Sequence, residues 1–466
     1  MTYVDLWIAL PLLLLAVGAL VTLIAGAALK NDDVAYRIAA VTLAGTVCWS
    51  IMLPPGNVAP VLGLCANSLT RLFIGFFALS AWAVLIFSRQ YNSWRGITGE
   101  EYPATVLFTT FGMVALAGSS NLMTLFLGLE AMSFGFYFLV GCDLRRERPS
   151  GVGMKYLLIG GISAALLAFG IALIYCAAGT LAVAHAFLPA SAISLAGWSF
   201  LLIGIAFKLS LVPAHLWTPD IYAEAPAPVT AFLSAGSKGA AVLLLLLILP
   251  RVGDSALLRL PLWCFALLSM VLGNLGALRQ SSLRRILAYS SIAQMGYVTL
   301  ALVSATGAGY RAAAYYMLAY GVISLAAFGV VAIMERAGID DTVEACRGLG
   351  SRHPFAALVF TLALFALAGI PPSAGFTGKF LIFSAAIQAG ELPLALIGIL
   401  TTVVSVYYYL RIVVAIYMQP ASGSGVVADG LPSVSERWLL ALLSLVIILC
   451  GIFPSQVYAR IAASFP

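Results

Sequence analysis

The feature that most constrains this chain is a succession of long apolar segments joined by short connections. Within its 466 residues, stretches of about 20 mainly apolar residues follow one another from one end to the other. A stretch of that length, wound as an α-helix, crosses the hydrocarbon core of a bilayer. Hydrophobic residues make up 62% of the chain and charged residues 9%, whereas a soluble globular chain has about a quarter charged residues. The sequence therefore predicts an integral membrane protein.

Fourteen candidate spanning segments define an all-α polytopic fold. The ten-residue alternating pattern of a membrane β-barrel is absent from the sequence. The first segment lacks the basic leader and small-residue cleavage site of a signal peptide, so we expect it to be retained. We place the segments near 5–29, 36–54, 70–88, 104–118, 120–140, 155–179, 198–222, 227–249, 262–278, 284–304, 311–334, 354–389 (long and broken), 393–418 and 437–454.

The distribution of lysine and arginine predicts the orientation of these segments. Of the 24 Lys and Arg residues, 15 lie in loops that follow an odd-numbered segment and 5 lie in even loops or at the C-terminus. Cytoplasmic loops carry the excess of basic residues. The odd loops are therefore predicted to be cytoplasmic, and both termini non-cytoplasmic. The net charge of +6 reflects this bias. It gives no nucleic-acid signature, because no basic run is interleaved with aromatic residues.

Two segments contain prolines that interrupt a helix. Segment seven carries Pro213 and Pro219, and segment twelve carries Pro371 and Pro372. Proline removes a backbone donor and clashes with the preceding turn. Interrupted helices at corresponding places in two halves indicate an inverted repeat. Since the breaks are five helices apart, the predicted repeats are helices 4–8 and 9–13.

This interpretation divides the chain into four parts. One feature resists the repeat, since Lys208 precedes its break and Lys379 follows its break. The predicted parts are an N-terminal three-helix segment (1–103), a first five-helix repeat (104–250), a second five-helix repeat (251–420), and a linker with the C-terminal helix (421–466).

Four ionisable residues lie deep in predicted spanning segments: Glu130, Lys208, Lys238 and Lys379. A charged residue at a helix centre costs about 2.5–3.5 kcal/mol on the insertion scale, so such residues usually serve a function. A buried lysine beside a carboxylate can be switched between charged and neutral forms when the carboxylate moves. We therefore predict a proton path through these four residues. Two structural alternatives stay open: Glu130 could serve only as a lysine's ion-pair partner, and Lys379 could only cap carbonyls freed by the break.

Further groups could assist proton transfer. His215 follows the break in segment seven and has an ordinary pKa suited to proton relay, although a lone histidine can also be a hydrogen-bonded filler. Lys155 lies at the start of segment six, where snorkelling to the boundary is an equal alternative. The tyrosines of 407–409 could instead form an interfacial aromatic belt. The secondary positions are Lys155, His215, Tyr289, Ser290, Gln294 and Tyr408.

The cysteines, Arg411 and the absence of cofactor motifs indicate no metal-binding, redox or cofactor site in this chain. The seven cysteines have neither metal nor redox spacing. Arg411 lies within segment thirteen, and its permanent charge suits pairing or snorkelling rather than relay. The sequence has no nicotinamide, flavin or iron–sulfur motif.

Several stretches resemble one known family. They are "KLSLVPAHLWTPDIYAEAPAPVTAFLSAGSK" (208–238), "NLMTLFLGLEAMSFGFYFLVG", "RRILAYSSIAQMGYVTLALV", "YYMLAYGVISLAAFGVV" and "LAGIPPSAGFTGKFLIFSAAI". Together they resemble the antiporter-like, proton-translocating membrane subunits of respiratory complex I, the NADH:quinone oxidoreductase. The wording of the first stretch is closest to the subunit N branch. The resemblance covers roughly 70–420.

The resemblance implies a fourteen-helix antiporter-like fold in the inner membrane of a bacterium. It implies that Glu130, Lys208, Lys238 and Lys379 match the family's proton-translocating residues. The implied partners are other membrane-arm subunits and a peripheral redox arm, within the lipid bilayer and without nucleic acid. This chain would be a non-redox subunit of a translocase and bind no cofactor, while NADH, flavin, iron–sulfur clusters and quinone belong to partner subunits. One departure is Gln294, where related sequences often carry histidine.

Three alternatives remain at this point. The chain could be a subunit of a cation/proton antiporter without a redox partner, or the membrane subunit of a hydrogenase-type complex. It could also be a structural scaffold. The stretch "HLWTPDIYAEAPAPVTAFLS" favours the complex I interpretation.

Overall fold

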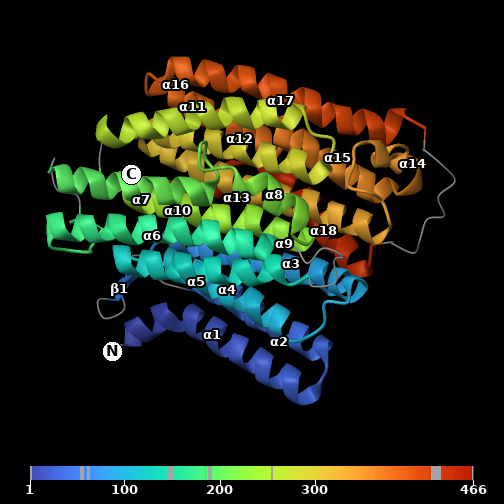
Figure 1. Ribbon diagram of the computed structural model, residues 1–466, viewed down its shortest axis with the longest axis horizontal. Helices are drawn as coiled ribbons and strands as arrows, with labels where there is room; N and C mark the ends of the chain where they lie inside the picture. Colours follow the sequence, from blue (N-terminus) through green and yellow to red (C-terminus); the bar gives the residue numbers. More distant parts are fainter. Residues whose placement is uncertain are drawn as a thin grey trace.

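The protein is a bundle of α-helices that run side by side along one direction (Figure 1). The only strands among the described residues form a short hairpin, in which β1 (Asn57–Ala59) pairs antiparallel with β2 (Leu64–Ala66). The computed structural model describes residues 3–52, 57–59, 63–143, 151–183, 185–186, 191–252, 256–420, 432–463 and 465.

The helices follow the predicted apolar segments closely. In chain order they are α1 (Tyr3–Leu29), α2 (Asp32–Met52), α3 (Ser68–Arg95), α4 (Glu101–Ala117), α5 (Leu122–Gly141), α6 (Val152–Ala178), α7 (Ala192–Leu209), α8 (Trp217–Glu224), α9 (Ala227–Phe232), the π-helix η1 (Leu233–Ser237), α10 (Lys238–Val252), α11 (Ala256–Leu278), α12 (Leu283–Val303), α13 (Gly307–Arg336), the 3₁₀-helix η2 (Glu344–Cys346), α14 (Leu349–Arg352), α15 (Pro354–Ala368), α16 (Ala374–Gln388), α17 (Leu392–Met418), α18 (Val434–Ile452) and α19 (Ser455–Ala462).

Twelve of the described helices are long and apolar enough to cross a membrane by themselves. The two predicted segments outside this set are α4, which has 17 residues, and segment twelve, which is split into α15 and α16 with 15 residues each. Every predicted segment nevertheless coincides with a helix or with helices that follow one another. The count of fourteen spans stays a prediction.

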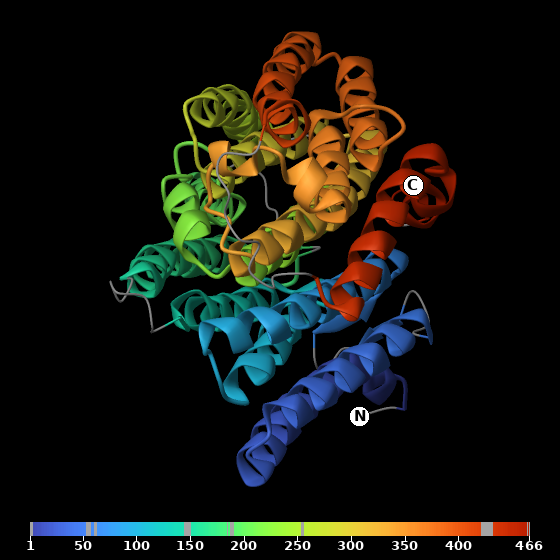
Figure 2. The ribbon, with the colours of Figure 1, turned by 90° about the vertical axis from the view of Figure 1, so that its right-hand side faces the viewer.

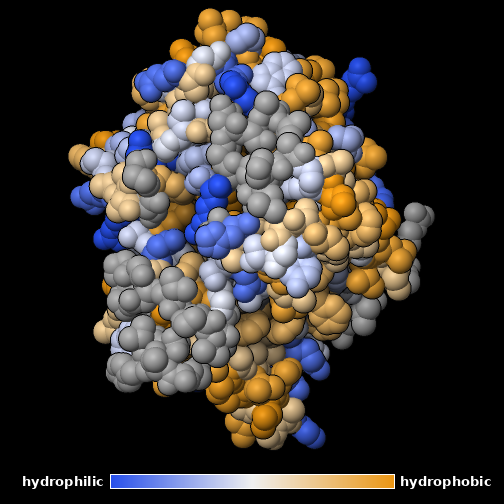
Figure 3. Space-filling view, turned by 90° about the vertical axis from the view of Figure 1, so that its left-hand side faces the viewer, coloured by the Kyte–Doolittle hydropathy of each residue, from blue (hydrophilic) through white to orange (hydrophobic). Residues whose placement is uncertain are grey.

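The two ends of the bundle differ in what they carry. The chain termini lie at the left end in Figure 1, and α14, from the loop after segment eleven, lies at the right end. Hydrophilic residues gather on the left end, while apolar residues dominate its margins (Figure 3). The connection after segment eleven therefore lies at the end opposite the termini, as alternating spans require.

The centre of the bundle is formed by the helices that carry most of the deep polar groups. In an 18-residue apolar stretch of each helix, the share of buried residues is 100% for α9–α10, 94% for α12 and 94% for α13. The corresponding share is 33% for α1 and 22% for α18. In the end-on view of Figure 2, α1 and α2 stand at one edge and the α16–α17 pair at the opposite edge. The peripheral helices present large apolar side chains outwards, such as Ile24 and Leu158.

Both predicted helix breaks are present. The helix α7 ends at Leu209, and Ser210 adopts a left-handed φ of 62°; the helix α15 ends at Ala368, and Gly369 adopts a φ of 86°. Backbone groups freed inside a membrane must find partners. At the first break the Ser269 hydroxyl accepts from the backbone N–H of Val212 at 2.9 Å. Lysine side chains donate hydrogen bonds to the freed carbonyl groups, as described below.

Candidate functional site

The first part of the site is an ion pair between α5 and α7. The Lys208 Nζ lies 3.8 Å from Glu130 Oε1 and donates a 2.7 Å hydrogen bond to Ser133 Oγ. The lysine side chain is 1% exposed and the glutamate side chain 24% exposed. Glu130 Oε1 accepts no hydrogen bond from the described residues. The carboxylate is thus held to the lysine by one long contact and is partly open to the surface.

The second part is Lys238, which reaches back to the first helix break. Its Nζ lies 3.2 Å from Ser210 Oγ and 3.4 Å from the carbonyl oxygen of Leu209, the last residue of α7. The C-terminus of a helix carries a partial negative charge that favours a cation. A π-helical turn, η1, directly precedes this lysine. Such turns occur often at functional sites. The lysine is 1% exposed and has no ion pair among the described residues.

The third part is Lys379, which caps the second break in the same way. Its Nζ donates to the carbonyl oxygens of Leu367 at 2.7 Å and Ala368 at 3.4 Å, the last residues of α15. The ammonium also lies 4.9 Å from the centroid of the Tyr297 ring. Here too, the described part of the chain supplies no carboxylate within ion-pair distance. The carbonyl-capping geometry predicted as an alternative is therefore observed, and it is shared with Lys238.

A buried polar cluster adjoins Lys379. Gln294 donates to the same Leu367 carbonyl at 3.0 Å and to the Tyr409 hydroxyl at 3.3 Å, and it accepts a hydrogen bond from Tyr316. Ser290 and Tyr409 share a short hydrogen bond between their hydroxyls. Of the secondary positions, Gln294 thus lies two hydrogen bonds from Lys379, and Ser290 joins the same cluster through Tyr409.

Polar side chains also connect the first half of the chain with the second. The Lys238 Nζ lies 5.8 Å from the centroid of the Tyr222 ring, and the Tyr222 hydroxyl accepts from Ser234 at 3.1 Å. Tyr320 donates to Ser291 at 2.6 Å, and Ser291 also interacts with Tyr222. Tyr316, which contacts Gln294, precedes Tyr320 by one helical turn on α13. These contacts lead from Lys238 towards Lys379, and the step from Tyr320 to Tyr316 spans one turn of α13.

A shorter link joins Lys208 to Lys238 through aromatic residues. The Lys208 Nζ lies 5.8 Å from the Tyr137 ring centroid. The Tyr137 and Tyr156 rings meet edge to face with centroids 4.9 Å apart. Tyr156 is buried and interacts with Ser237, the residue before Lys238. The structure therefore arranges Glu130, which is partly exposed, and the three buried lysines in one series, in their order along the chain.

Three secondary positions lie outside this series. Lys155 forms an ion pair with Asp220, which also pairs with Arg285 at 3.3 Å; the Lys155 side chain is 46% exposed. The His215 ring contacts the carbonyl oxygen of Pro213 at 3.3 Å. The half-buried Tyr289 ring packs against Gly276 of α11.

Tyr408 packs against Tyr409 of the Gln294 cluster, with ring centroids 4.4 Å apart. Its hydroxyl donates to Asn274 Oδ1 at 3.0 Å, and Asn274 donates to the Tyr297 hydroxyl at 3.1 Å. Tyr297 is the residue whose ring lies below the Lys379 ammonium. Tyr408 and Tyr409 are both fully buried, so these two tyrosines are not part of an interfacial belt.

Several residues that contact the site are not among the predicted positions. Ser133 follows Glu130 by three residues and therefore shares its helix face, which is a signal that spacing alone contains. Tyr316 and Tyr320 are four apart on α13 and also share a face. Nothing local indicated Tyr222 or Ser291, because their importance depends on which distant helix they meet.

The described residues hold no cluster of three or more His, Cys, Asp or Glu side chains suited to a metal ion. The site instead consists of one carboxylate, three ammonium groups and neutral donors and acceptors. Such groups bind and release protons and exchange hydrogen bonds.

Comparisons with known proteins agree with this geometry. A family model described as NADH:quinone oxidoreductase/Mrp antiporter, TM, matches residues 119–405. The NADH-quinone oxidoreductase subunit N of Geobacter metallireducens is 50% identical over 467 residues, covering 99% of both chains. A chain of respiratory complex I from Thermus thermophilus superposes with a TM-score of 0.83 at 30% identity, covering 97% of this chain and 99% of that one.

A chain of the Mrp complex from Dietzia sp. superposes with a TM-score of 0.88 at 20% identity, covering 100% of this chain and 97% of that one. At that identity the likeness concerns the fold alone. The predicted antiporter-like, all-α membrane fold is confirmed. The family match spans both helix breaks and all four deep ionisable residues, and the chain belongs to the NADH:quinone oxidoreductase/Mrp antiporter transmembrane family.

Proposed function

We propose that this chain is subunit N of an NADH:quinone oxidoreductase, the proton-translocating respiratory complex I. Its relatives carry that name over their whole length. The chain would sit in the membrane arm beside other membrane subunits. NADH oxidation and quinone reduction, with flavin and iron–sulfur clusters, would take place in partner subunits. This chain would contribute proton transfer to the reaction.

The observation that carries the proposal is the buried series from Glu130 to Lys379. Three lysine ammonium groups, each no more than 3% exposed, lie inside an apolar bundle. Each would cost about 2.5–3.5 kcal/mol at a helix centre. Two of them contact carbonyls at helix breaks, and polar side chains fill the intervals between them. An ion-pair partner or a carbonyl cap does not need to titrate, whereas a proton path requires groups that bind and release protons.

Each of the four residues has a distinct proposed role. Glu130 is the switch, because its single long contact lets it leave Lys208 and thereby favour release of the lysine's proton. Lys238 accepts that proton at the first break. Lys379 is the last station, at the second break. Near Lys379 the proton would pass along hydroxyl groups of Ser290 and neighbouring tyrosines and along water. Gln294 does not titrate, so it would only donate and accept hydrogen bonds in this path.

The remaining secondary positions have supporting roles in this proposal. Lys155, paired with Asp220 and followed directly by the buried Tyr156, would mark an entrance at the end predicted to be cytoplasmic. Tyr408 would orient Tyr297 through Asn274. His215 would act at the surface of the first break, and Tyr289 would act at the surface of α12.

The proposal also covers the internal repeat and the orientation. Repeats of helices 4–8 and 9–13 would place the two breaks in equivalent positions. The similar capping of both breaks by lysine supports this assignment. The first break is capped by Lys238 from the following span, whereas the second is capped by Lys379 from the broken helix itself. Both termini would face the non-cytoplasmic side of a bacterial inner membrane, as the loop charges predict.

Conservative substitution of Lys379 in the intact complex separates proton transfer from structural capping. Lys379→Arg keeps a cation at the break, but arginine does not release a proton at physiological pH. We expect both Lys379→Arg and Lys379→Met to lose most NADH-driven proton uptake in reconstituted vesicles, while both complexes assemble. Normal pumping by Lys379→Arg, together with failure of Lys379→Met, would show that the lysine serves only as a cap.

Purification of the chain with its neighbours tests the choice of complex. We expect it to co-purify with flavin- and iron–sulfur-containing subunits. Association with nickel-containing subunits would identify a hydrogenase-type complex, and association without any redox subunit would identify a cation/proton antiporter.

A further inference from the structure

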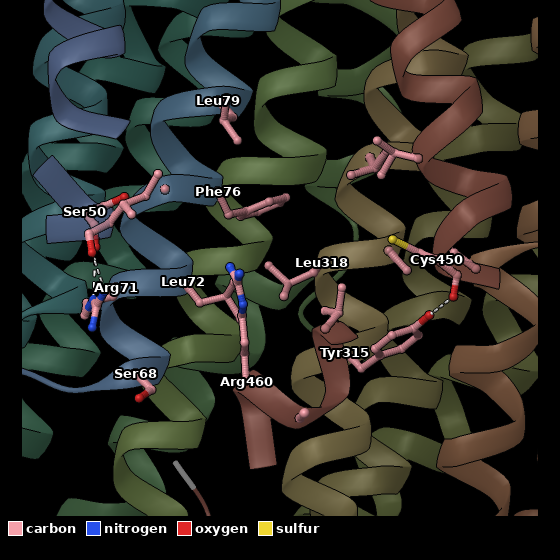
Figure 4. A pocket seen from close by; sticks show the side chains of 18 of the residues that line it. Ser50, Ser68, Arg71, Leu72, Phe76, Leu79, Tyr315, Leu318, Cys450 and Arg460 are labelled. Atoms are coloured by element: carbon pink, nitrogen blue, oxygen red, sulfur yellow. Dashed lines mark hydrogen bonds between the residues drawn. The ribbon is translucent and has the colours of Figure 1, made fainter. Parts of the chain in front are cut away.

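A large apolar cleft lies on the side of the bundle, away from the series of lysines. Its volume is about 840 Å³, and α2, α3, α13 and α18 form its walls, with α19 at one end. Figure 4 shows Leu72, Phe76 and Leu79 of α3 facing Leu318 of α13 across this space. Leu79 is 49% exposed and Ile51 is 68% exposed, so the cleft opens towards the membrane.

Two arginines lie at one end of the cleft. Arg71 stands in the first turn of α3 and donates from Nε and Nη2 to the carbonyl oxygens of Ser50 and Ile51 at the end of α2. Arg460, from α19, is exposed at the surface and points up into the cleft between Leu72 and Leu318 (Figure 4). No carboxylate among the described residues forms an ion pair with either arginine.

The dimensions of the cleft match one leaflet of a bilayer. Along α3, the eight-residue step from Arg71 to Leu79 corresponds to about 12 Å of helix rise. One leaflet contributes half of a hydrocarbon core about 30 Å thick. The arginines stand at the start of a spanning helix and in the short helix that follows the last span. They therefore lie where lipid headgroups begin, and the apolar walls lie where acyl chains extend.

We propose that this cleft binds an anionic membrane phospholipid, with its phosphate between Arg71 and Arg460 and an acyl chain along Leu72, Phe76 and Leu318. Charge complementarity favours an anionic headgroup, because two arginines without described acidic partners line the same cleft. The apolar walls exclude a free inorganic anion as the main occupant. The lipid would join the N-terminal helices α2 and α3 to α13, α18 and α19 in the second half of the chain.

Lipid analysis of the purified complex tests the site. The complex is washed in mild detergent, and its retained phospholipids are measured by mass spectrometry. We expect the Arg71→Gln/Arg460→Gln double variant to lose about one anionic phospholipid per complex, with zwitterionic lipids unchanged. Arg251→Gln is the matched control, because Arg251 is exposed in the last turn of α10, on the membrane side predicted for Arg71 and Arg460, but lies outside the cleft lining. It should retain the lipid.

A second variant and a labelling measurement distinguish lipid bound inside the cleft from lipid attracted only to the charge of the two arginines. Val322→Trp fills the apolar part of the cleft and leaves both arginines in place, so it should lose the same lipid. In the unmutated, delipidated complex, maleimide labelling of the half-buried Cys450, which lines the cleft, should slow several-fold on addition of phosphatidylglycerol but not phosphatidylcholine.

Three outcomes overturn the proposal. The first is an unchanged anionic lipid content in both the double variant and Val322→Trp. The second is lipid loss in the double variant but not in Val322→Trp, which would place the lipid on the outer surface. The third is a cross-link from Cys450 to a helix of a neighbouring subunit in the intact complex, which would make the cleft a protein contact.

Discussion

The two helix breaks of this protein are built alike but are charged differently. In each, the last carbonyls of the first half-helix accept hydrogen bonds from a buried lysine, Lys238 at the first break and Lys379 at the second. The first broken helix carries an additional lysine, Lys208, beside the carboxylate of Glu130. Near the second break the corresponding polar partner is the neutral Gln294. The first region therefore contains an ion pair, whereas Lys379 at the second has no ion-pair partner among the described residues.

This difference assigns unequal tasks to the two halves. A carboxylate that moves by an ångström or two changes the electrostatic energy of a neighbouring ammonium strongly in a low-dielectric interior. A neutral amide has no such influence, so it can only pass a hydrogen bond along. Under the proposed function, the first half would be the place where a conformational signal changes proton affinity. The second half would be the place where a proton is stored and handed on.

The largest expected effect comes from removing Lys208. Lys208→Met leaves Glu130 without its cation, and loss of one partner of a buried pair destabilises a protein by about 3–5 kcal/mol. We expect NADH-driven proton pumping to fall at least about tenfold, together with a lower yield of assembled complex. Native gel analysis and vesicle acidification measure the two effects.

The double variant Glu130→Gln/Lys208→Met is the control for that experiment. It removes both charges, so assembly should recover while pumping stays low. Recovery of pumping in the double variant would mean that the ion pair has only a structural role.

Removal of the cap on the first break should have the next largest effect. Lys238→Met leaves the buried Leu209 carbonyl with one partner fewer, at a cost of about 1–3 kcal/mol. Amide hydrogen exchange over residues 209–217 should accelerate about tenfold for each 1.4 kcal/mol lost. Exchange at 368–374 should not change, because Lys379 caps that break. Equal acceleration at both breaks would show that they are not independent.

Introducing a carboxylate at the second break makes it resemble the first. Gln294→Glu removes the amide that donates to Leu367 and places a negative charge near Lys379. The ammonium would then be held in its charged form, and we expect pumping to fall about threefold. Gln294→His keeps a donor and a group able to relay protons, so its pumping rate should stay close to that of the unmutated complex. Faster pumping by Gln294→Glu would contradict the unequal roles of the two breaks.

The smallest expected effect concerns Ser133. Ser133→Ala removes one hydrogen bond to the Lys208 ammonium, worth about 1–3 kcal/mol for a charged group, but leaves the ion pair with Glu130 in place. We expect proton pumping within about twofold of the unmutated rate. Ser290→Ala removes a neutral hydroxyl contact near the second break and serves as the comparison variant. A loss as large as that of Lys208→Met would make Ser133 an essential carrier.

The sequence alone determined where helices lie, where two of them break and which residues are both buried and ionisable. Apolar length decides membrane insertion, and proline decides helix interruption, so both are local properties. Depth within a segment was enough to select Glu130, Lys208, Lys238 and Lys379. The structure lines these four up in one series.

Only the tertiary structure decided which of these groups meet. Lys238 caps a break on another helix, and Tyr222 and Ser291 join two halves of the chain, because helices far apart in sequence pack side by side. The same packing left Lys155 at the surface and His215 beside its own turn. Hydropathy and proline act within a single helix, whereas a contact between side chains depends on how helices rotate and approach one another.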